Sequence, residues 1–172
     1  MGESFELDVD WITAGAVGEP GRRTFYVQGR QGGELVVLLV EKNQVRMLAQ
    51  LAAQLLSRVD VAVTPDDLDT ARQALVDPAV PAWRAGTMSL GMEADGERFL
   101  LEAEELMEPE AVGEAGTARF WMNRDQLVGL AAYAAYAVEA GARETCRLCS
   151  RPIDPISGHV CPASNGHGPL TV

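Results

Sequence analysis

The pattern of apolar and polar positions divides this chain into two stretches with the same order of elements. Runs rich in β-branched, aromatic and aliphatic residues occur at 11–15, 23–28 and 34–40, and an apolar-periodic stretch follows at 44–59. Runs at 83–90, 97–104 and 117–122 precede a second such stretch at 126–138. Glycine and proline separate the runs, as they commonly do between strands. The sequence therefore predicts a βββα unit that occurs twice.

The two helices are the most clearly defined of these elements. Apolar residues recur at three- and four-residue steps in both, which places them on one face of each helix: Val45, Leu48, Ala52, Leu55, Leu56 and Val59 in the first, and Leu127, Leu130, Ala131, Ala134 and Val138 in the second. Asn123 followed by Gln126 is typical of a capping box at the start of the second helix. Gly141 is suited to end it.

The strand patterns predict how the helices are used. Residues 35–40 are continuously apolar, which is typical of a central strand covered on both faces, whereas residues 99–105 mix apolar and acidic positions and are expected to be half exposed. We expect an α+β fold in which antiparallel three-stranded sheets are joined or packed with pseudo-twofold symmetry, and both helices cover the apolar faces.

The predicted domain organisation is a duplicated body at residues 1–141 and a small metal-binding tail at 142–172. The body consists of a first repeat at 5–60, a linker at 61–81 and a second repeat at 82–141. Within the linker, Thr64 and Pro65 are expected to begin a short helix. The sequence leaves open whether the two halves close on each other or pair between chains in a homodimer.

Charge and composition narrow the classes of function. The chain has 172 residues, with 25 acidic and 14 basic residues and a formal net charge of −11. Such a chain is repelled by phosphate backbones and anionic membranes, which argues against nucleic-acid binding. The acidic N-terminus and the lack of a long apolar run predict a soluble cytoplasmic protein with no membrane insertion.

All three cysteines and one of the two histidines fall within sixteen positions near the C-terminus. Cys146 and Cys149 are separated by two residues, and His159 and Cys161 follow after nine more. Three thiolates and an imidazole suit tetrahedral zinc. We therefore predict a structural zinc knuckle with Cys146, Cys149, His159 and Cys161 as its ligands.

Other interpretations of this cluster remain open at this point. His167 could take the fourth position in place of His159, although the His-x-Cys spacing favours His159. The four residues could be unmetallated, or the zinc could be catalytic, although four protein ligands leave no open position for water. A redox Cys-x-x-Cys is disfavoured because that chemistry requires the motif at the start of a helix that follows a strand.

No catalytic set can be assembled from the remaining residues. Both histidines lie in the tail, which excludes a Ser/His/Asp triad in the body. The segment at residues 18–23 lacks the Gly-Lys-Ser/Thr ending of a phosphate-binding loop, so we expect a β-turn there, with an anion site at Arg22 and Arg23 as the alternative. The paired Glu104 and Glu105 are expected to be an ordinary acidic strand end.

Three phrases of the sequence resemble a bacterial family called domain of unknown function 3090. They are Gly15 to Gln28, Gly86 to Gly91, and the cysteine pair followed by Pro155, Gly-His159-x-Cys161-Pro and Asn165-Gly166. The resemblance covers nearly the whole chain. It implies protein partners, because family members are neighbours of genes for a histidine-phosphatase-like protein and a kinase-like protein. It supplies no catalytic residues.

We therefore expect an uncharacterised zinc-containing interaction or regulatory protein that acts through protein partners and is not an enzyme. The first alternative is a nucleic-acid-binding protein with a zinc ribbon, which requires a basic face that the sequence lacks. The second is a zinc-dependent enzyme.

Overall fold

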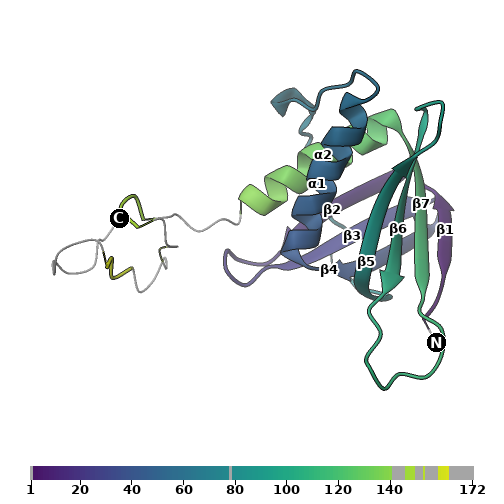
Figure 1. The fold of residues 1–172 in the computed structure, drawn as a ribbon, viewed down its shortest axis with the longest axis horizontal. Helices are drawn as coiled ribbons and strands as arrows, with labels where there is room; N and C mark the ends of the chain where they lie inside the picture. Colours follow the sequence, from purple (N-terminus) through teal and green to yellow (C-terminus); the bar gives the residue numbers. More distant parts are fainter. Residues whose placement is uncertain (1, 78, 141–145, 150–152, 154–158, 163–172) are drawn as a thin grey trace.

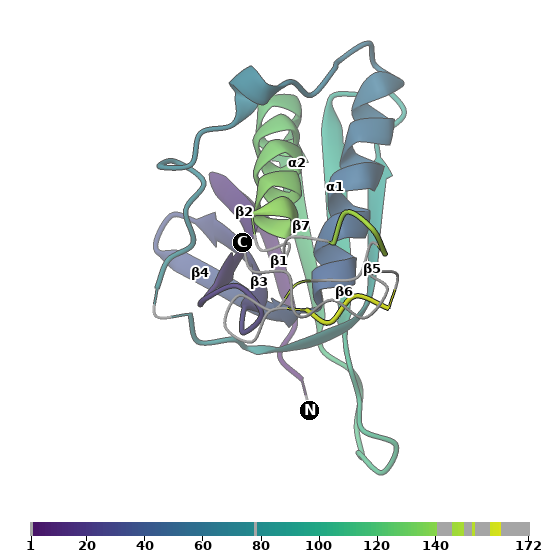
Figure 2. The same ribbon diagram turned by 90° about the vertical axis from the view of Figure 1, so that its left-hand side faces the viewer.

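A computed structural model describes residues 2–77, 79–140, 146–149, 153 and 159–162. Within these residues, one seven-stranded sheet has two α-helices packed side by side on one of its faces (Figures 1 and 2). The strand order is β1-β7-β6-β5-β4-β3-β2. The α+β class predicted from the sequence is confirmed.

Two antiparallel three-stranded meanders make up most of the sheet. The first contains β2 (Trp11–Val17), β3 (Thr24–Gln31) and β4 (Glu34–Val40), and the second contains β5 (Trp83–Met92), β6 (Arg98–Glu105) and β7 (Thr117–Asn123). A short parallel pairing of β4 with β5 joins them, with Leu38 opposite Trp83 and Leu39 opposite Arg84. The meanders therefore form one sheet in which β4 and β5 are central.

The sequence did not predict β1 (Phe5–Asp8), which pairs in parallel with β7. Only two residues separate it from β2, yet β1 and β2 are the two outermost strands of the sheet. The Val9 N–H donates to the carbonyl of Trp121 on β7 at 2.9 Å, and the Asp10 N–H donates to the carbonyl of Arg30 on β3 at 2.8 Å. Consecutive residues thus connect the two ends of the sheet, which curls back on itself.

The expected antiparallel three-stranded sheets are present as the two meanders, and the sequence had left open that parallel contacts join them. Both parallel contacts, β1 with β7 and β4 with β5, join segments that are distant in the chain. Local sequence patterns carry information on turns between neighbouring strands but not on such long-range partners.

The two helices have the same length and begin in the same way. Helix α1 (Lys42–Ser57) follows β4, and α2 (Arg124–Glu139) follows β7. Each has a capping box: Glu41 with Gln44 in α1, and Asn123 with Gln126 in α2. Such boxes satisfy backbone N–H groups that have no partner inside the helix. The buried residues of both helices include all the apolar positions predicted from the sequence except Val59, which lies beyond the end of α1.

The core lies between the helices and the sheet. Its largest fully buried side chains include Phe99, Phe120, Leu38, Leu56 and Leu127, from both meanders and both helices. Burying a side chain of this size contributes about 1.5–3 kcal/mol. Because these residues form one cluster, the two halves of the body share a single core.

The linker between the halves crosses the outside of this core and is held by buried polar side chains of β2 and β3. A short 3-10 helix, η1 (Pro65–Asp67), begins after Thr64, as predicted. Thr13 Oγ1 donates to the Gln73 carbonyl at 2.6 Å, and the Gln28 amide exchanges hydrogen bonds of 2.9 and 2.8 Å with the backbone of Val76. Neither helix of the described chain is long and apolar enough to cross a membrane.

Candidate metal centre

The structure brings together the four side chains that the sequence singled out near the C-terminus. One potential ligand atom from each of Cys146, Cys149, His159 and Cys161 lies within 4.8 Å of all the others. Cys146 and Cys161 are buried, whereas Cys149 and His159 are half-buried. These residues could hold a metal ion. His167, the alternative fourth ligand, lies outside the described residues.

The distances within the cluster distinguish it from a disulfide. The sulfur atoms of Cys146 and Cys161 are 3.6 Å apart, whereas a disulfide requires about 2.05 Å. Two thiolates on one tetrahedral zinc, with Zn–S bonds of about 2.3 Å, have sulfurs about 3.8 Å apart. On the other side of the cluster, Cys149 Sγ lies 2.9 Å from His159 Nε2. The sulfur–sulfur distance thus fits two ligands of one zinc, whereas the Cys149–His159 distance is shorter than the distance of about 3.6 Å between a thiolate and an imidazole nitrogen on a tetrahedral zinc, so these two side chains would have to move slightly apart to bind it.

The backbone next to Cys146 favours the deprotonated form of its thiol. Residues 147–149 form a turn. The backbone N–H groups of Leu148 and Cys149, which donate to the sulfur, are the largest causes that lower the pKa of the Cys146 thiol to about 7. Because the thiolate is the metal ligand, this turn favours the binding form of the side chain.

Donor chemistry agrees with the geometry. Thiolate and imidazole ligands select borderline and soft metals, while magnesium and calcium prefer oxygen. Among the described residues, this is the only group of three or more His, Cys, Asp and Glu side chains close enough to hold a metal ion.

The other residues weighed from the sequence have structural contacts. The segment at residues 18–23 is the turn between β2 and β3, with Gly18 and Gly21 at positive φ, so the predicted turn is confirmed. Arg23 donates to the Ala137 carbonyl near the end of α2 at 3.4 Å. Glu104 accepts a hydrogen bond from Thr87, and Glu105 accepts one from the Gly116 N–H.

Sequence reasoning did not single out the polar side chains that gather at the start of α2. Asp67, Asp69 and Gln73 from the linker and Asp125 from α2 line one hollow of about 490 Å³. The high number of aspartates in the linker was the one sequence feature that could have indicated this hollow. It could not be used, because nothing in the pattern placed the linker against α2.

Comparisons with known proteins give one match. A model of the family described as "Protein of unknown function (DUF3090)" matches residues 4–161, which include both meanders, both helices and all four residues of the metal cluster. No curated protein and no solved structure matches the chain. Because the family match covers most of the chain, the resemblance inferred from the sequence is confirmed, and the chain belongs to the DUF3090 family.

Proposed function

We propose that this chain is a zinc protein whose metal has a structural role, and that it acts as an interaction or regulatory protein through a protein partner. The observation that carries the proposal is the convergence of three cysteines and one histidine within 4.8 Å. Four protein ligands fill a tetrahedral coordination shell and leave no position for a reacting water. This donor set therefore favours a structural over a catalytic zinc.

The metal supplies folding free energy to the tail. Structural zinc contributes about 10–16 kcal/mol of apparent binding free energy in small zinc-finger peptides. Such a contribution is sufficient to order a short segment with little apolar core. We propose that residues 142–172 form a zinc-dependent tail and that the metal fixes a surface of this tail for a partner.

We also propose that the body at residues 1–141 arose by internal duplication. The strongest support is the parallel role of two glutamines at the third position of their helices. Gln44 Nε2 in α1 donates to the carbonyls of Ala85 and Gly86 on β5 at 3.2 and 3.0 Å. Gln126 Nε2 in α2 donates to the carbonyl of Val9, between β1 and β2, at 2.7 Å.

These contacts relate corresponding parts of the two halves. Each glutamine completes the capping box of its own helix and also reaches the strand segment that pairs in parallel with the preceding strand. The β1–β2 segment thus has the same relation to β7 and α2 as β5 has to β4 and α1. The proposed repeats are residues 5–60 and 82–141, joined by the linker at 61–81.

Metal analysis of the purified protein tests the zinc proposal. We expect about one zinc per chain, because four donors complete one tetrahedral site, and loss of that zinc in Cys146→Ser. Leu148→Ser is the matched control, since Leu148 lies in the same turn, is exposed and offers no strong ligand. A protein that contains no zinc when purified and takes up none on addition would contradict the proposal.

An affinity pull-down from native cells tests the partner proposal. The first candidates are histidine-phosphatase-like and kinase-like proteins, which the family resemblance implies. We expect a partner to be retained by the zinc-loaded protein and lost with Cys146→Ser. Retention by both forms would exclude a role for the metal in binding, and turnover of phosphoester substrates by the isolated protein would favour an enzyme instead.

A further inference from the structure

A groove of about 250 Å³ lies between α1 and β5. None of the described residues that line it is charged, although acidic and basic residues make up 23% of the chain. Its lining includes Met47, Leu51 and Met88, and Met47 is 59% exposed. Methionine side chains adapt to partners of different shape and are frequent at protein-binding surfaces. The groove is therefore an apolar surface on a strongly charged protein.

One wall of the groove is an edge of β5 that has no partner strand. β4 pairs with β5 only at Trp83 and Arg84, because β4 ends at Val40 and the chain then continues into α1. Residues 86–90 of β5, beyond this pairing, line the groove. Gln44 Nε2 donates to the carbonyl of Gly86, and this contact satisfies only the beginning of the open edge.

The hydrogen bonds of the β5–β6 hairpin identify the backbone groups that face this edge. The Glu93 N–H donates to the Arg98 carbonyl, and hydrogen-bonded and non-hydrogen-bonded pairs alternate along an antiparallel ladder. The N–H and C=O groups of Met88, Leu90 and Met92 therefore point away from β6. They make no hydrogen bond with the described residues. Three donors and three acceptors are thus available to an added strand.

The sequence of this edge carries no protection against pairing. Exposed edge strands in proteins are commonly blocked by charged side chains or proline, which keep other strands from adding to them. Residues 87–92 of β5 read Thr-Met-Ser-Leu-Gly-Met and contain neither a charged residue nor a proline. The edge is therefore open to pairing with another chain segment.

The registers of the two meanders relate this groove to an equivalent place in the first half of the body. Equivalent pairs are Phe25–Val40 and Phe99–Met122, and Ile12–Gly29 and Met88–Ala103. Thr87 and Ser89 of β5 therefore correspond to Trp11 and Thr13 of β2. Both helices have 16 residues and follow equivalent strands, so Met47 of α1 corresponds to Gly129 of α2.

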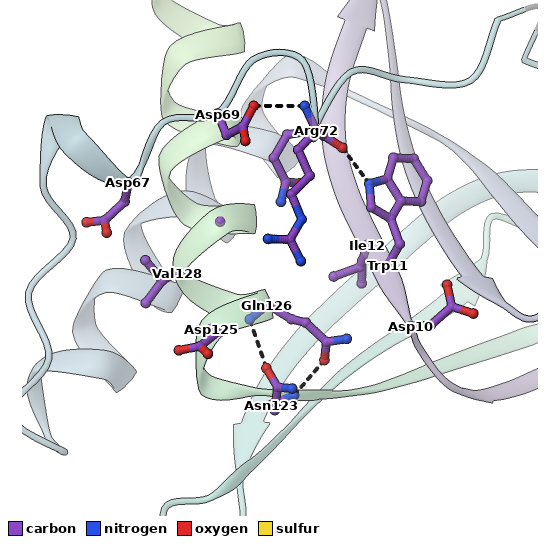
Figure 3. A pocket seen from close by; sticks show the side chains of 12 residues that line it. Asp10, Trp11, Ile12, Asp67, Asp69, Arg72, Asn123, Asp125, Gln126 and Val128 are labelled. Atoms are coloured by element: carbon purple, nitrogen blue, oxygen red, sulfur yellow. Dashed lines mark hydrogen bonds between the residues drawn. The ribbon is translucent and has the colours of Figure 1, made fainter.

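In the first half, the linker fills the equivalent place. Trp11 Nε1 donates to the Arg72 carbonyl at 2.8 Å, as the dashed line in Figure 3 shows, and Thr13 Oγ1 donates to the Gln73 carbonyl at 2.6 Å. Gln73 also packs against α2, since a Cβ at Gly129 would lie 2.6 Å from its Nε2. A segment of chain thus contacts both β2 and α2.

The groove at α1 is the same place without a covering segment. The equivalents of the three residues that contact the linker, which are Thr87, Ser89 and Met47, all line the groove. Thr13 is fully buried under the linker, whereas Ser89 is exposed. The described residues of the tail lie clear of the body (Figure 1), so they do not cover the groove.

We propose that the groove between α1 and β5 binds an extended segment of a protein partner, which adds to the open edge of β5 as a strand. This inference rests on the proposed function as an interaction protein and places a partner on the body, away from the metal cluster. Backbone pairing supplies affinity, and the groove selects the side chains. The uncharged lining favours a segment with apolar side chains at alternate positions, because a charge buried there would have no partner.

A hexapeptide of alternating leucine and threonine with blocked ends is the first probe, and methyl NMR of the full chain is the measurement. We expect saturable shifts of the methyl signals of Met47 and Met88, which line the groove. The signal of Met122, which is buried and does not line the groove, should stay unchanged.

Two N-methylated forms of the peptide test whether it pairs as a strand. A strand offers only every second N–H to one neighbour, so the two forms carry methyl groups on the two alternate sets of amides. We expect binding to weaken at least about tenfold in one form, which loses its hydrogen bonds to β5, and to change little in the other. Equal affinities of the two forms would exclude strand pairing and overturn the proposal.

A pair of variants on α1 locates the peptide in the groove. Met47→Glu places a charge against an apolar ligand and is expected to weaken peptide binding at least about tenfold. Gln50→Glu is the matched control, because Gln50 is exposed on the same helix and does not line the groove. Thermal unfolding establishes that both variants are folded. Equal binding by Met47→Glu and the wild type, or no binding at about 10 mM peptide, would contradict the proposal.

The same signals distinguish the other possible occupants. If the tail of the same chain fills the groove, the signals of Met47 and Met88 in the free protein should shift when a chelator removes the metal. If a second copy fills it, the signals should depend on protein concentration, and sedimentation should show a dimer. Either result would overturn the assignment to a partner.

Metal analysis of the same samples separates this inference from the zinc proposal. A protein that contains zinc but does not bind the peptide contradicts the partner site in the groove and leaves the zinc proposal standing. A protein that binds the peptide but contains and takes up no zinc contradicts only the role proposed for the metal.

Discussion

Gly29 on β3 lies directly against the ring of Phe120 on β7. A Cβ added at Gly29 would be 2.5 Å from Phe120 Cδ1 and 3.3 Å from Val9 Cγ1. In the strand order, β3 and β7 are separated by three other strands, so this contact spans the interior of the curled sheet. Glycine is required here by space, because Phe120 is fully buried and cannot move toward solvent.

We expect Gly29→Ala to lower the free energy of unfolding by about 1–3 kcal/mol, the usual cost of overpacking a core. Denaturant unfolding measures the change. Gly91→Ala is the control, since Gly91 is an exposed strand residue with nothing within 4 Å of an added Cβ. A loss of stability at Gly91 equal to that at Gly29 would show that the contact with Phe120 is not the cause of the loss.

The buried amide of Gln28 should determine whether the linker stays on the sheet. Gln28→Met removes both hydrogen bonds to the backbone of Val76 while keeping most of the side-chain volume. We expect a loss of about 1–3 kcal/mol in stability, because backbone groups lose their partners. Hydrogen exchange at the Val76 N–H should become faster.

The same substitution at Gln50 is the control for Gln28. Gln50 is exposed on α1, and its side chain makes no hydrogen bond with the described residues. Gln50→Met should change stability by no more than about 0.5 kcal/mol. If exchange at Val76 is as fast in the wild type as in Gln28→Met, the linker is not held by this amide.

Removal of the metal should affect the tail and spare the body. A chelator is expected to expose the thiols of Cys146 and Cys161 to a thiol reagent, because the proposed zinc would no longer protect them. Far-ultraviolet circular dichroism should change little, since the two helices and seven strands of the described residues lie within residues 5–139. A cooperative loss of the whole spectrum would instead make the metal essential to the body.

Asp10 should make stability dependent on pH only under acidic conditions. The backbone N–H of Gly32, followed by the Arg30 guanidinium, lowers the pKa of the Asp10 carboxyl below its usual value. A lowered pKa adds stability above the unfolded value, near pH 3.9, and this contribution is lost as the pH falls through the folded pKa. The difference in stability between wild type and Asp10→Asn should be constant from about pH 5 to 8 and shrink below about pH 4. A difference that persists at acidic pH would exclude the carboxylate as its cause.

The helices could be predicted because their signals are local. The buried positions from Val45 to Leu56 repeat with the period of one helix face, and Asn123 and Gln126 form the predicted capping box. The metal cluster could be predicted for the same reason, since its four residues lie within sixteen positions of the sequence. Each of these features depends on residues that are close in the chain.

Features that depend on distant partners could not be predicted. The four residues of β1 make a strand only because Phe5 is paired with Ala118 on β7. The hollow at α2 needs the linker, β2 and α2 to meet. From composition alone, the polar residues of the linker are expected to be exposed to solvent.

The pairing of β1 with β7 also constrains the order in which the protein can fold during synthesis. β1 emerges from the ribosome before its partner β7, which lies more than 100 residues later, at Thr117–Asn123. Contacts of such long sequence separation form slowly, because a large loop must close before they add stability. The N-terminal strand must therefore wait unpaired until nearly the whole body has been made, and completing the sheet is a late step of folding.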